Sequence, residues 1–273
     1  MFEAELEAAS TLARAAGRAV LEVYGSELHV ELKGGADPVT EADRNANTLL
    51  VQGLRAHFAD DGIVAEEGSD QADGASRPRC WFVDPLDGTK EFIARNGEFS
   101  VMLGLAIEGR AVLGVVYQPV GDTLYRGVIG QGAQLEQRGA LRPLTVSELA
   151  EPARLKLVVS RSHRSSKTDA VVQRLGITAE RPSGSVGLKV GCIVKREADL
   201  YVHISDRSSK WDACGPEAIL RAAGGRFTDL LGRPIDYREN DLRNASGLLA
   251  CNAAAFDAVL PVVSAVAREA GFS

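Results

Sequence analysis

The sequence is organised around one stretch, Trp81-Phe82-Val83-Asp84-Pro85-Leu86-Asp87-Gly88-Thr89-Lys90-Glu91-Phe92, in which a short apolar run stops at two carboxylates. Residues 81–83 are typical of a buried strand, and Pro85 interrupts the strand ladder because proline has no N–H to donate. Asp84 and Asp87 then share a tight bend, where two like charges repel each other unless a cation lies between them. A divalent metal ion is the natural occupant of such a bend. The alternative is an ordinary surface turn with two solvated aspartates, because Asp, Pro and Gly are common turn residues.

The composition is that of a globular protein and limits its partners. Of the 273 residues, 45% are hydrophobic and 25% are charged, which excludes a disordered chain. No apolar stretch approaches the roughly 20 residues that cross a bilayer, and the first residues are acidic where a secretory signal is basic. We therefore expect a cytoplasmic protein without a membrane span. The net charge of −6 argues against a nucleic-acid polymer as partner, but a small anionic substrate is compatible because bound metal ions supply local positive charge. The four cysteines are scattered singly and are expected to be buried free thiols.

The pattern of expected elements divides the chain into two halves. Short connections imply antiparallel neighbours among the strands expected at residues 99–107, 111–117 and 123–127. From residue 155 strands alternate with helices, which predicts a second α/β layer. We therefore expect an N-terminal α+β half at residues 1–150, carrying most of the metal ligands, and a C-terminal α/β half at residues 151–273. Two segments rich in glycine are predicted to be a loop and a series of turns, namely residues 33–38 and 127–139.

Further acidic residues lie where expected elements begin or end. An apolar run at residues 63–65 stops at Glu66 and Glu67, and two strands that end in carboxylates suggest one shared site. Asp43 follows Thr40 by three residues, which is the spacing of a capping box, so a structural role alone would explain it. Asp212 lies near the start of another expected helix, where the helix dipole favours a carboxylate whether or not it binds anything.

Taken together, the motifs resemble the inositol monophosphatase superfamily of magnesium-dependent, lithium-sensitive phosphatases. The acidic pair Glu66-Glu67, the stretch from Trp81 to Phe92, and Lys210-Trp211-Asp212 before Gly215-Pro216-Glu217-Ala218 stand in the order of that family. The resemblance implies an α+β fold, a layered α-β-α-β-α sandwich of the inositol monophosphatase and fructose-1,6-bisphosphatase type. Within the superfamily, the 3′-phosphoadenosine 5′-phosphate phosphatases are the most similar group, by Gly88-Thr89-Lys90-Glu91-Phe92, Ser160-Arg161-Ser162-His163, and Gly184-Ser185 preceding Lys189.

The resemblance also implies a metal site with two to three Mg²⁺ ions. Glu66, Asp84 and the backbone carbonyl of Leu86 would hold one ion, and Asp84, Asp87 and Asp212 would hold a second, while Glu66 would also touch a third. Such a site is chemically sound, because hard cations prefer carboxylate and carbonyl oxygens, and two ions about 4 Å apart can clamp the attacking and leaving oxygens of a displacement. Glu67 would lie at the edge of the ligand set.

The resemblance also implies which residues are catalytic and which bind the substrate. The catalytic residues would be Glu66, together with Asp43 and Thr89, which would orient the attacking water. A small phosphorylated substrate would contact Asp87, Gly88, Thr89, Ser160, His163, Ser185, Lys189 and Asp212. For Lys189 and His163, as for Arg161, the alternative is an exposed side chain that touches no substrate.

The function implied is removal of the 3′-phosphate from adenosine 3′,5′-bisphosphate, which yields AMP and phosphate. Two alternatives remain open. One is an inositol monophosphatase, and the other, from a different class, is an inactive regulatory or binding protein on the same fold. A monomer and a homodimer are both compatible with these motifs.

Overall fold

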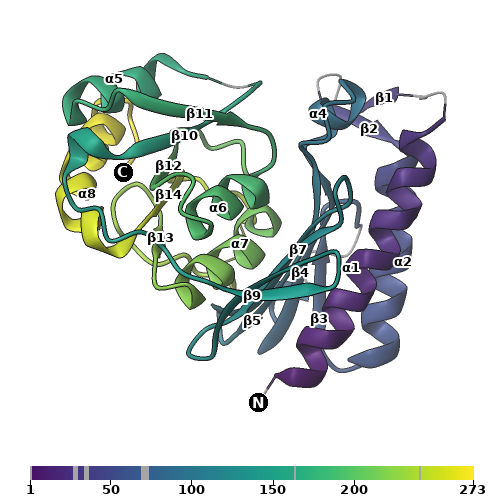
Figure 1. The fold of residues 1–273 in the computed structure, drawn as a ribbon. Helices are drawn as coiled ribbons and strands as arrows, with labels where there is room; N and C mark the ends of the chain where they lie inside the picture. Colours follow the sequence, from purple (N-terminus) through teal and green to yellow (C-terminus); the bar gives the residue numbers. More distant parts are fainter. Residues whose placement is uncertain (1, 27–29, 34–36, 69–73, 163, 240) are drawn as a thin grey trace.

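The chain forms five alternating layers of helix and sheet in a computed structural model that describes residues 2–26, 30–33, 37–68, 74–162, 164–239 and 241–273. In Figure 1 the helices α1 and α2 lie outside a seven-stranded sheet, the helices α6 and α7 lie between that sheet and a five-stranded sheet, and α5 and α8 cover the far side. The layered α-β-α-β-α sandwich expected from the resemblance is confirmed. The seven-stranded sheet lies within residues 1–150, and the five-stranded sheet lies within residues 151–273.

The first layer is a pair of amphipathic helices, α1 (Glu3–Tyr24) and α2 (Glu41–His57), that bury one face each. Ala13, Ala16 and Leu50 are among the buried residues of these helices, which share one apolar cluster with the adjacent sheet. A hairpin of β1 (Val30–Lys33) and β2 (Asp37–Thr40) precedes α2, with Lys33 opposite Asp37. The prediction of a loop over residues 33–38 was therefore wrong at both ends, because Lys33 belongs to β1 and Pro38 to β2. Proline is tolerated here because each strand of a two-stranded ribbon is an edge.

The seven-stranded sheet has its strands in sequence order from β3 to β9. The pair β3–β4 is parallel, and the other pairs are antiparallel as expected. The strands are β3 (Gly62–Ala65), β4 (Arg79–Asp87), β5 (Ser100–Ile107), β6 (Arg110–Gln118), β7 (Thr123–Val128), β8 (Gly132–Gln137) and β9 (Ala140–Leu144). The prediction of turns alone over residues 127–139 was wrong, since β8 lies there. Buried Ala133 and Leu135 alternate with exposed positions in β8, which is the pattern of a half-buried strand.

The five-stranded sheet has the order β11-β10-β12-β14-β13. Its strands are β10 (Lys156–Ser160), β11 (Ala179–Ser183), β12 (Leu200–His203), β13 (Arg226–Thr228) and β14 (Leu248–Cys251). On its outer side, α5 (Ser166–Leu175) and α8 (Ala253–Glu269) enclose an apolar cluster with β10, β12 and β14. A short 3₁₀ helix, η1 (Pro152–Arg154), precedes β10.

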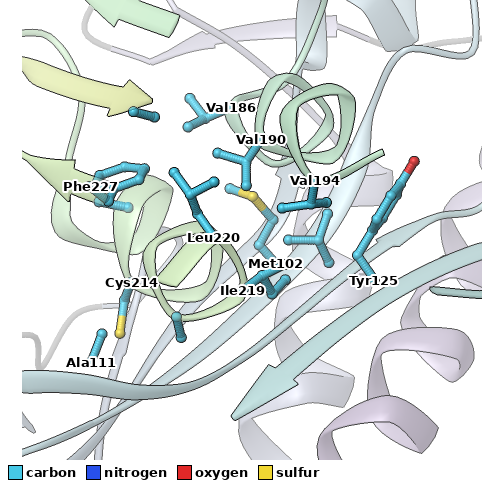
Figure 2. Packing of buried hydrophobic residues seen from close by; sticks show 14 of the residues in the cluster. Met102, Ala111, Tyr125, Val186, Val190, Val194, Cys214, Ile219, Leu220 and Phe227 are labelled. Atoms are coloured by element: carbon cyan, nitrogen blue, oxygen red, sulfur yellow. The ribbon is translucent and has the colours of Figure 1, made fainter. Parts of the chain in front are cut away.

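The central layer, formed by α6 (Val186–Val194) and α7 (Lys210–Ala222), is packed between the two sheets. Figure 2 shows its core, where Val190 of α6 and Leu220 of α7 lie close to Met102 of β5. Helix α7 also touches the sheet backbone directly. A Cβ atom added to Gly104 would lie 2.4 Å from the Gly215 nitrogen, and one added to Gly114 would lie 2.0 Å from the Gly215 oxygen. This close approach, possible only without side chains, brings the start of α7 to the end of β4.

All four cysteines are buried and free, as expected. Within the described part of the chain, every helix is too short or too polar to cross a bilayer.

Candidate active site

The site begins where β4 leaves the sheet. The register of β4 against β5 shifts between Asp84 and Asp87, as expected around Pro85. Asp84 is buried, and its Oδ1 accepts a hydrogen bond of 3.0 Å from the backbone N–H of Leu86, which tightens the bend. Gly88 follows with φ of 97°, a conformation that side chains rarely adopt. The short helix α4 (Thr89–Ile93) then starts directly behind the two aspartates.

Helix α7 supplies a third carboxylate to this bend. Asp212 is the third residue of α7, and it accepts a 2.6 Å hydrogen bond from the backbone N–H of Ser209 in a capping box. Carboxylate oxygens of Asp84, Asp87 and Asp212 all lie within 4.8 Å of one another. The helix cap and the close packing of Gly215 therefore deliver an acid from position 212 to a bend at positions 84–87.

Burial, and for Asp84 and Asp212 also neighbouring negative charge, destabilises the charged forms of the three carboxylates. Burial, followed by the charges of Glu66, Asp87 and Asp212, raises the pKa of Asp84 well above its usual value. Burial also raises the pKa of Asp87, and burial with the charge of Asp87 raises the pKa of Asp212 to about 7. At this separation two unit charges repel by at least about 3 kcal/mol at an effective dielectric constant of about 20. A divalent cation bound among these oxygens would remove that cost.

Asp43 combines the structural role with a contact to the site. Its Oδ2 accepts hydrogen bonds from the backbone N–H and the hydroxyl of Thr40, at 2.7 and 2.6 Å, and closes the capping box of α2. Its Oδ1 accepts a hydrogen bond of 3.3 Å from the hydroxyl of Thr89, which lies equally far from the carbonyl oxygen of Leu86. Burial raises the pKa of Asp43, although the hydrogen bonds from Thr40 oppose the shift. The two readings of Asp43 are thus compatible, because each uses a different oxygen.

The start of α6 closes the site from the other side. Oδ2 of Asp87 accepts hydrogen bonds from the Ser185 hydroxyl at 2.6 Å and from the backbone N–H groups of Val186 and Gly187. Because Ser185 gives its single hydroxyl hydrogen to Asp87, the neighbouring Ser100 hydroxyl, 2.8 Å away, must donate to Ser185. The expected substrate contact Ser185 therefore positions a proposed metal ligand.

Lys189 brings positive charge to the acidic cluster. Its side chain is buried rather than exposed, and its ammonium donates a 3.2 Å hydrogen bond to the backbone oxygen of Ser185 and lies 5.3 Å from the centre of the Tyr201 ring. Burial lowers the pKa of Lys189, while the charges of Asp87, Glu91, Asp212 and Glu98 oppose that shift. One lysine thus offsets only part of the negative charge around it.

Glu66 and Glu67 follow β3 beside the bend and are half-buried. The backbone N–H of Glu66 donates to the carbonyl oxygen of Val83 at 3.1 Å, which ties it to β4. The charge of Glu66 contributes to the raised pKa of Asp84, and the charge of Glu67 contributes to that of Asp43. Both acids therefore lie within electrostatic reach of the site.

The turn after β10 borders the same region. Ser160 is the last residue of β10 and pairs with Ser183 of β11, whereas His163 lies outside the described residues. Arg161 donates to the carboxylate of Glu98. Sequence reasoning assigned no role to Glu98 and took Glu91 only as a possible mark of a nucleotide substrate. Glu91 lies in α4 and Glu98 in the segment between α4 and β5. The signal available in the sequence was an acid two residues after Thr89.

Comparisons with known proteins place the chain among phosphatases. The model of the inositol monophosphatase family matches residues 2–263. The 3′(2′),5′-bisphosphate nucleotidase CysQ of Escherichia coli (strain K12) is 36% identical over 237 residues, which cover 85% of this chain and 93% of the relative. The solved IMPase structure from Thermotoga maritima superimposes with a TM-score of 0.82 at 28% identity, covering 98% of this chain and 99% of that one. CysQ from Bacteroides thetaiotaomicron gives a TM-score of 0.78 at 29% identity, covering 92% and 98%.

Fold, acidic cluster and relatives together define a phosphatase, a hydrolase that acts on phosphate monoesters. Within that class, the chain belongs to the inositol monophosphatase family.

Proposed function

We propose that the protein is a magnesium-dependent nucleotidase that removes the 3′-phosphate from adenosine 3′,5′-bisphosphate. The observation that carries the metal-dependent part is the cluster of Asp84, Asp87 and Asp212, whose oxygens lie within 4.8 Å of one another. The substrate is suggested by the 3′(2′),5′-bisphosphate nucleotidase CysQ of Escherichia coli, which aligns with most of the chain, and by the Gly88–Phe92 motif.

The donor set fits a hard divalent cation. The cluster offers carboxylate oxygens, to which Glu66 and the carbonyl of Leu86 would add two more, and it uses neither histidine nor cysteine. The raised pKa values of the three aspartates indicate uncompensated negative charge. Bound magnesium would supply Lewis-acid chemistry, activating water near neutral pH and neutralising charge on the phosphoryl oxygens. Two to three ions are proposed, as in the superfamily that the sequence resembles.

The protein's own groups would orient the nucleophile. Thr89 gives its hydroxyl hydrogen to Asp43 Oδ1, so its oxygen can accept a hydrogen bond from the attacking water. Asp43 is held rigidly by its two bonds to Thr40 and could receive the water's proton through Thr89. We further propose that the backbone N–H groups of Gly88 and Thr89 contact the substrate phosphate, and that Ser160, His163 and Lys189 face the rest of the substrate.

An inositol monophosphatase is the second candidate, because the Thermotoga maritima IMPase shares the whole fold at 28% identity. The discriminating experiment measures phosphate release from adenosine 3′,5′-bisphosphate and from inositol 1-phosphate, with Mg²⁺ or with EDTA. We expect kcat/KM to be at least about tenfold higher for the nucleotide, and activity to vanish in EDTA. Faster turnover of inositol phosphate would overturn the substrate assignment, and full activity in EDTA would overturn the metal assignment. If neither ester is hydrolysed, the alternative of an inactive regulatory or binding protein would be favoured. Millimolar lithium should inhibit the reaction if the family resemblance extends to the metal site.

A further inference from the structure

A second group of acidic residues ties the two halves together next to the site. Glu91 of α4 is buried, and its Oε1 accepts a hydrogen bond from the hydroxyl of Ser162 in the turn after β10. Seventy-one positions separate the two residues in sequence. Glu91 and Thr89 lie on the same five-residue helix, α4. The hydrogen bond from Ser162 to Glu91 therefore fixes the turn after β10 relative to the helix that carries Thr89.

Glu98 makes a second tie beside the first. Arg161 donates from Nε to Glu98 Oε2 at 2.7 Å, and from a terminal nitrogen to Oε1, so the pairing is bidentate. The same Oε2 accepts a 2.7 Å hydrogen bond from the backbone N–H of Gly184, the residue before Ser185. Burial opposes ionisation of Glu98, but the hydrogen bonds from Arg161 and Gly184 outweigh it and lower its pKa.

Gly184 leaves no spare room between these elements. A Cβ atom added there would lie 2.4 Å from the backbone oxygen of Glu98 and 2.5 Å from Cγ of Glu91. The next residue, Ser185, donates to Asp87 in the acidic cluster. A continuous chain of contacts therefore runs from the cluster, through the β11–α6 turn, to the turn after β10.

We propose that Glu91 is a positioning residue that holds residues 160–162 in place as a wall of the active site, so that the site favours an ester with a large group beyond its phosphate. This inference rests on the proposed nucleotidase function and extends it to specificity. The acidic cluster handles the phosphate, which every phosphate ester carries. Residues 160–162 belong to the other half and connect to the cluster through Glu91, Glu98 and the β11–α6 turn, so a substrate would have to extend beyond its phosphate to contact them. Ordering residues 160–162 in advance lowers the entropy lost on binding, and the gain applies only to substrates that reach them.

Ser162→Ala tests the proposal, because Ser162 is exposed and its loss leaves α4 intact. The kinetics of the wild type, Ser162→Ala, Ser162→Thr and Glu91→Gln are measured with Mg²⁺ on adenosine 3′,5′-bisphosphate and on p-nitrophenyl phosphate, a small monoester. We expect Ser162→Ala to raise KM for the nucleotide about five- to tenfold, the net worth of one typical hydrogen bond, with kcat within about twofold. KM for the small ester should not change, and Ser162→Thr, which keeps the hydroxyl, should restore the nucleotide KM.

A double mutant and a control make the test specific. Ser162→Ala combined with Glu91→Gln should raise KM no more than the worse single change, because the two residues share one bond. Arg174→Ala, which removes an exposed ion pair with Glu269 inside the C-terminal half, should leave both KM values unchanged. Equal changes for the two esters, or no change in the nucleotide KM, would overturn the proposal.

Amide hydrogen exchange supplies a readout that needs no substrate. We expect faster exchange at residues 160–162 in Ser162→Ala than in the wild type or in Arg174→Ala. If the wild type fails to hydrolyse the nucleotide but amide exchange at residues 160–162 increases in Ser162→Ala, the proposed function is wrong and the positioning role of Glu91 is supported. If the nucleotide is hydrolysed but Ser162→Ala changes neither amide exchange nor KM, the positioning role of Glu91 is wrong and the proposed function is unaffected.

Discussion

Helix α7 carries two acidic residues in contrasting surroundings. Glu217 is buried, and it accepts hydrogen bonds from the Tyr237 hydroxyl at 2.6 Å and from Arg221 at 2.8 Å. Asp212, five residues earlier, faces Asp84 and Asp87. Burial raises the pKa of both, but Tyr237 and Arg221 oppose the rise at Glu217, whereas the charge of Asp87 adds to the rise at Asp212. The protein's own groups satisfy Glu217, whereas Lys189 and the hydrogen bonds to Asp87 offset only part of the negative charge of the Asp212 cluster, and a bound cation would offset the rest.

The largest effect should come from a substitution within the cluster of Asp84, Asp87 and Asp212. Asp84→Asn keeps the shape of the side chain but removes one charge from the cluster. We expect turnover to fall at least about 10³-fold, because the loss of bound cations removes several kcal/mol of transition-state stabilisation. The melting temperature of the metal-free protein should stay the same or rise, since one repulsive charge has gone. Activity assays with Mg²⁺ measure the loss of turnover, and thermal melts in EDTA measure the melting temperature of the metal-free protein. Turnover that stays near the wild-type value would contradict the expectation.

Glu217→Ala is the matched change at the acid that the protein's own groups satisfy. It leaves the Tyr237 hydroxyl without its acceptor and Arg221, which is partly exposed, without its ion pair. We expect the free energy of unfolding to fall by about 2–3 kcal/mol, while kcat per folded molecule stays near the wild-type value. A large loss of kcat with little loss of stability would reverse the roles assigned to the two acids.

The pH dependence of stability should sharpen the contrast. Burial raises the pKa of the three clustered aspartates, and repulsion by neighbouring aspartates adds to the rise for Asp84 and for Asp212, whose pKa reaches about 7 from the usual value of 3.8. The folded, metal-free protein therefore binds more protons than the unfolded chain between about pH 4 and pH 7, so the stability present at low pH is lost as pH rises through this window. Magnesium should stabilise the protein little at pH 4 and strongly at pH 8. Denaturant unfolding at both pH values, with Mg²⁺ or EDTA, measures this, and equal magnesium effects at the two would contradict it.

The smallest effect concerns the cap beneath Asp43. Thr40→Ala removes the hydroxyl that donates to Asp43 Oδ2 but leaves the backbone N–H at 2.7 Å. We expect a stability loss of about 1 kcal/mol, typical of a lost N-cap, and a decrease in kcat of less than about tenfold. Ser209→Ala, the corresponding change in the capping box of Asp212, serves as the comparison. A far larger loss of kcat in Thr40→Ala would mean that the hydroxyl contributes more than support.

Local signals in the sequence predicted much of the fold and of the acidic cluster. The apolar run before Asp84, the capping box at Thr40 and the helix start at Asp212 depend on near neighbours, and the structure has a strand and two helices there. Edge elements were missed, because β9 is mostly exposed and β11 contains Pro182, so neither has the pattern of a buried strand.

Partners that lie far apart in sequence could not be predicted. Three such features each depend on residues from different elements. They are the burial of Lys189, the contact of Asp87 with the start of α6, and the hydrogen bond from Ser162 to Glu91. A carboxylate's partner depends on how helices and sheets pack, which single-residue chemistry does not reveal. The hydrogen bond from the Ser185 hydroxyl to Asp87 has the same origin and could not be predicted, and the substrate contact expected of Ser185 stays a prediction.

The central claim is that a divalent cation replaces protons in the cluster of Asp84, Asp87 and Asp212. Titration calorimetry of Mg²⁺ at pH 6.5, in two buffers of different ionisation enthalpy, measures both binding and proton release. We expect the wild type and Glu217→Ala to bind Mg²⁺ and release protons, and Asp84→Asn to bind Mg²⁺ more weakly and release fewer protons. Magnesium binding without proton release, or equal binding by Asp84→Asn, would contradict it.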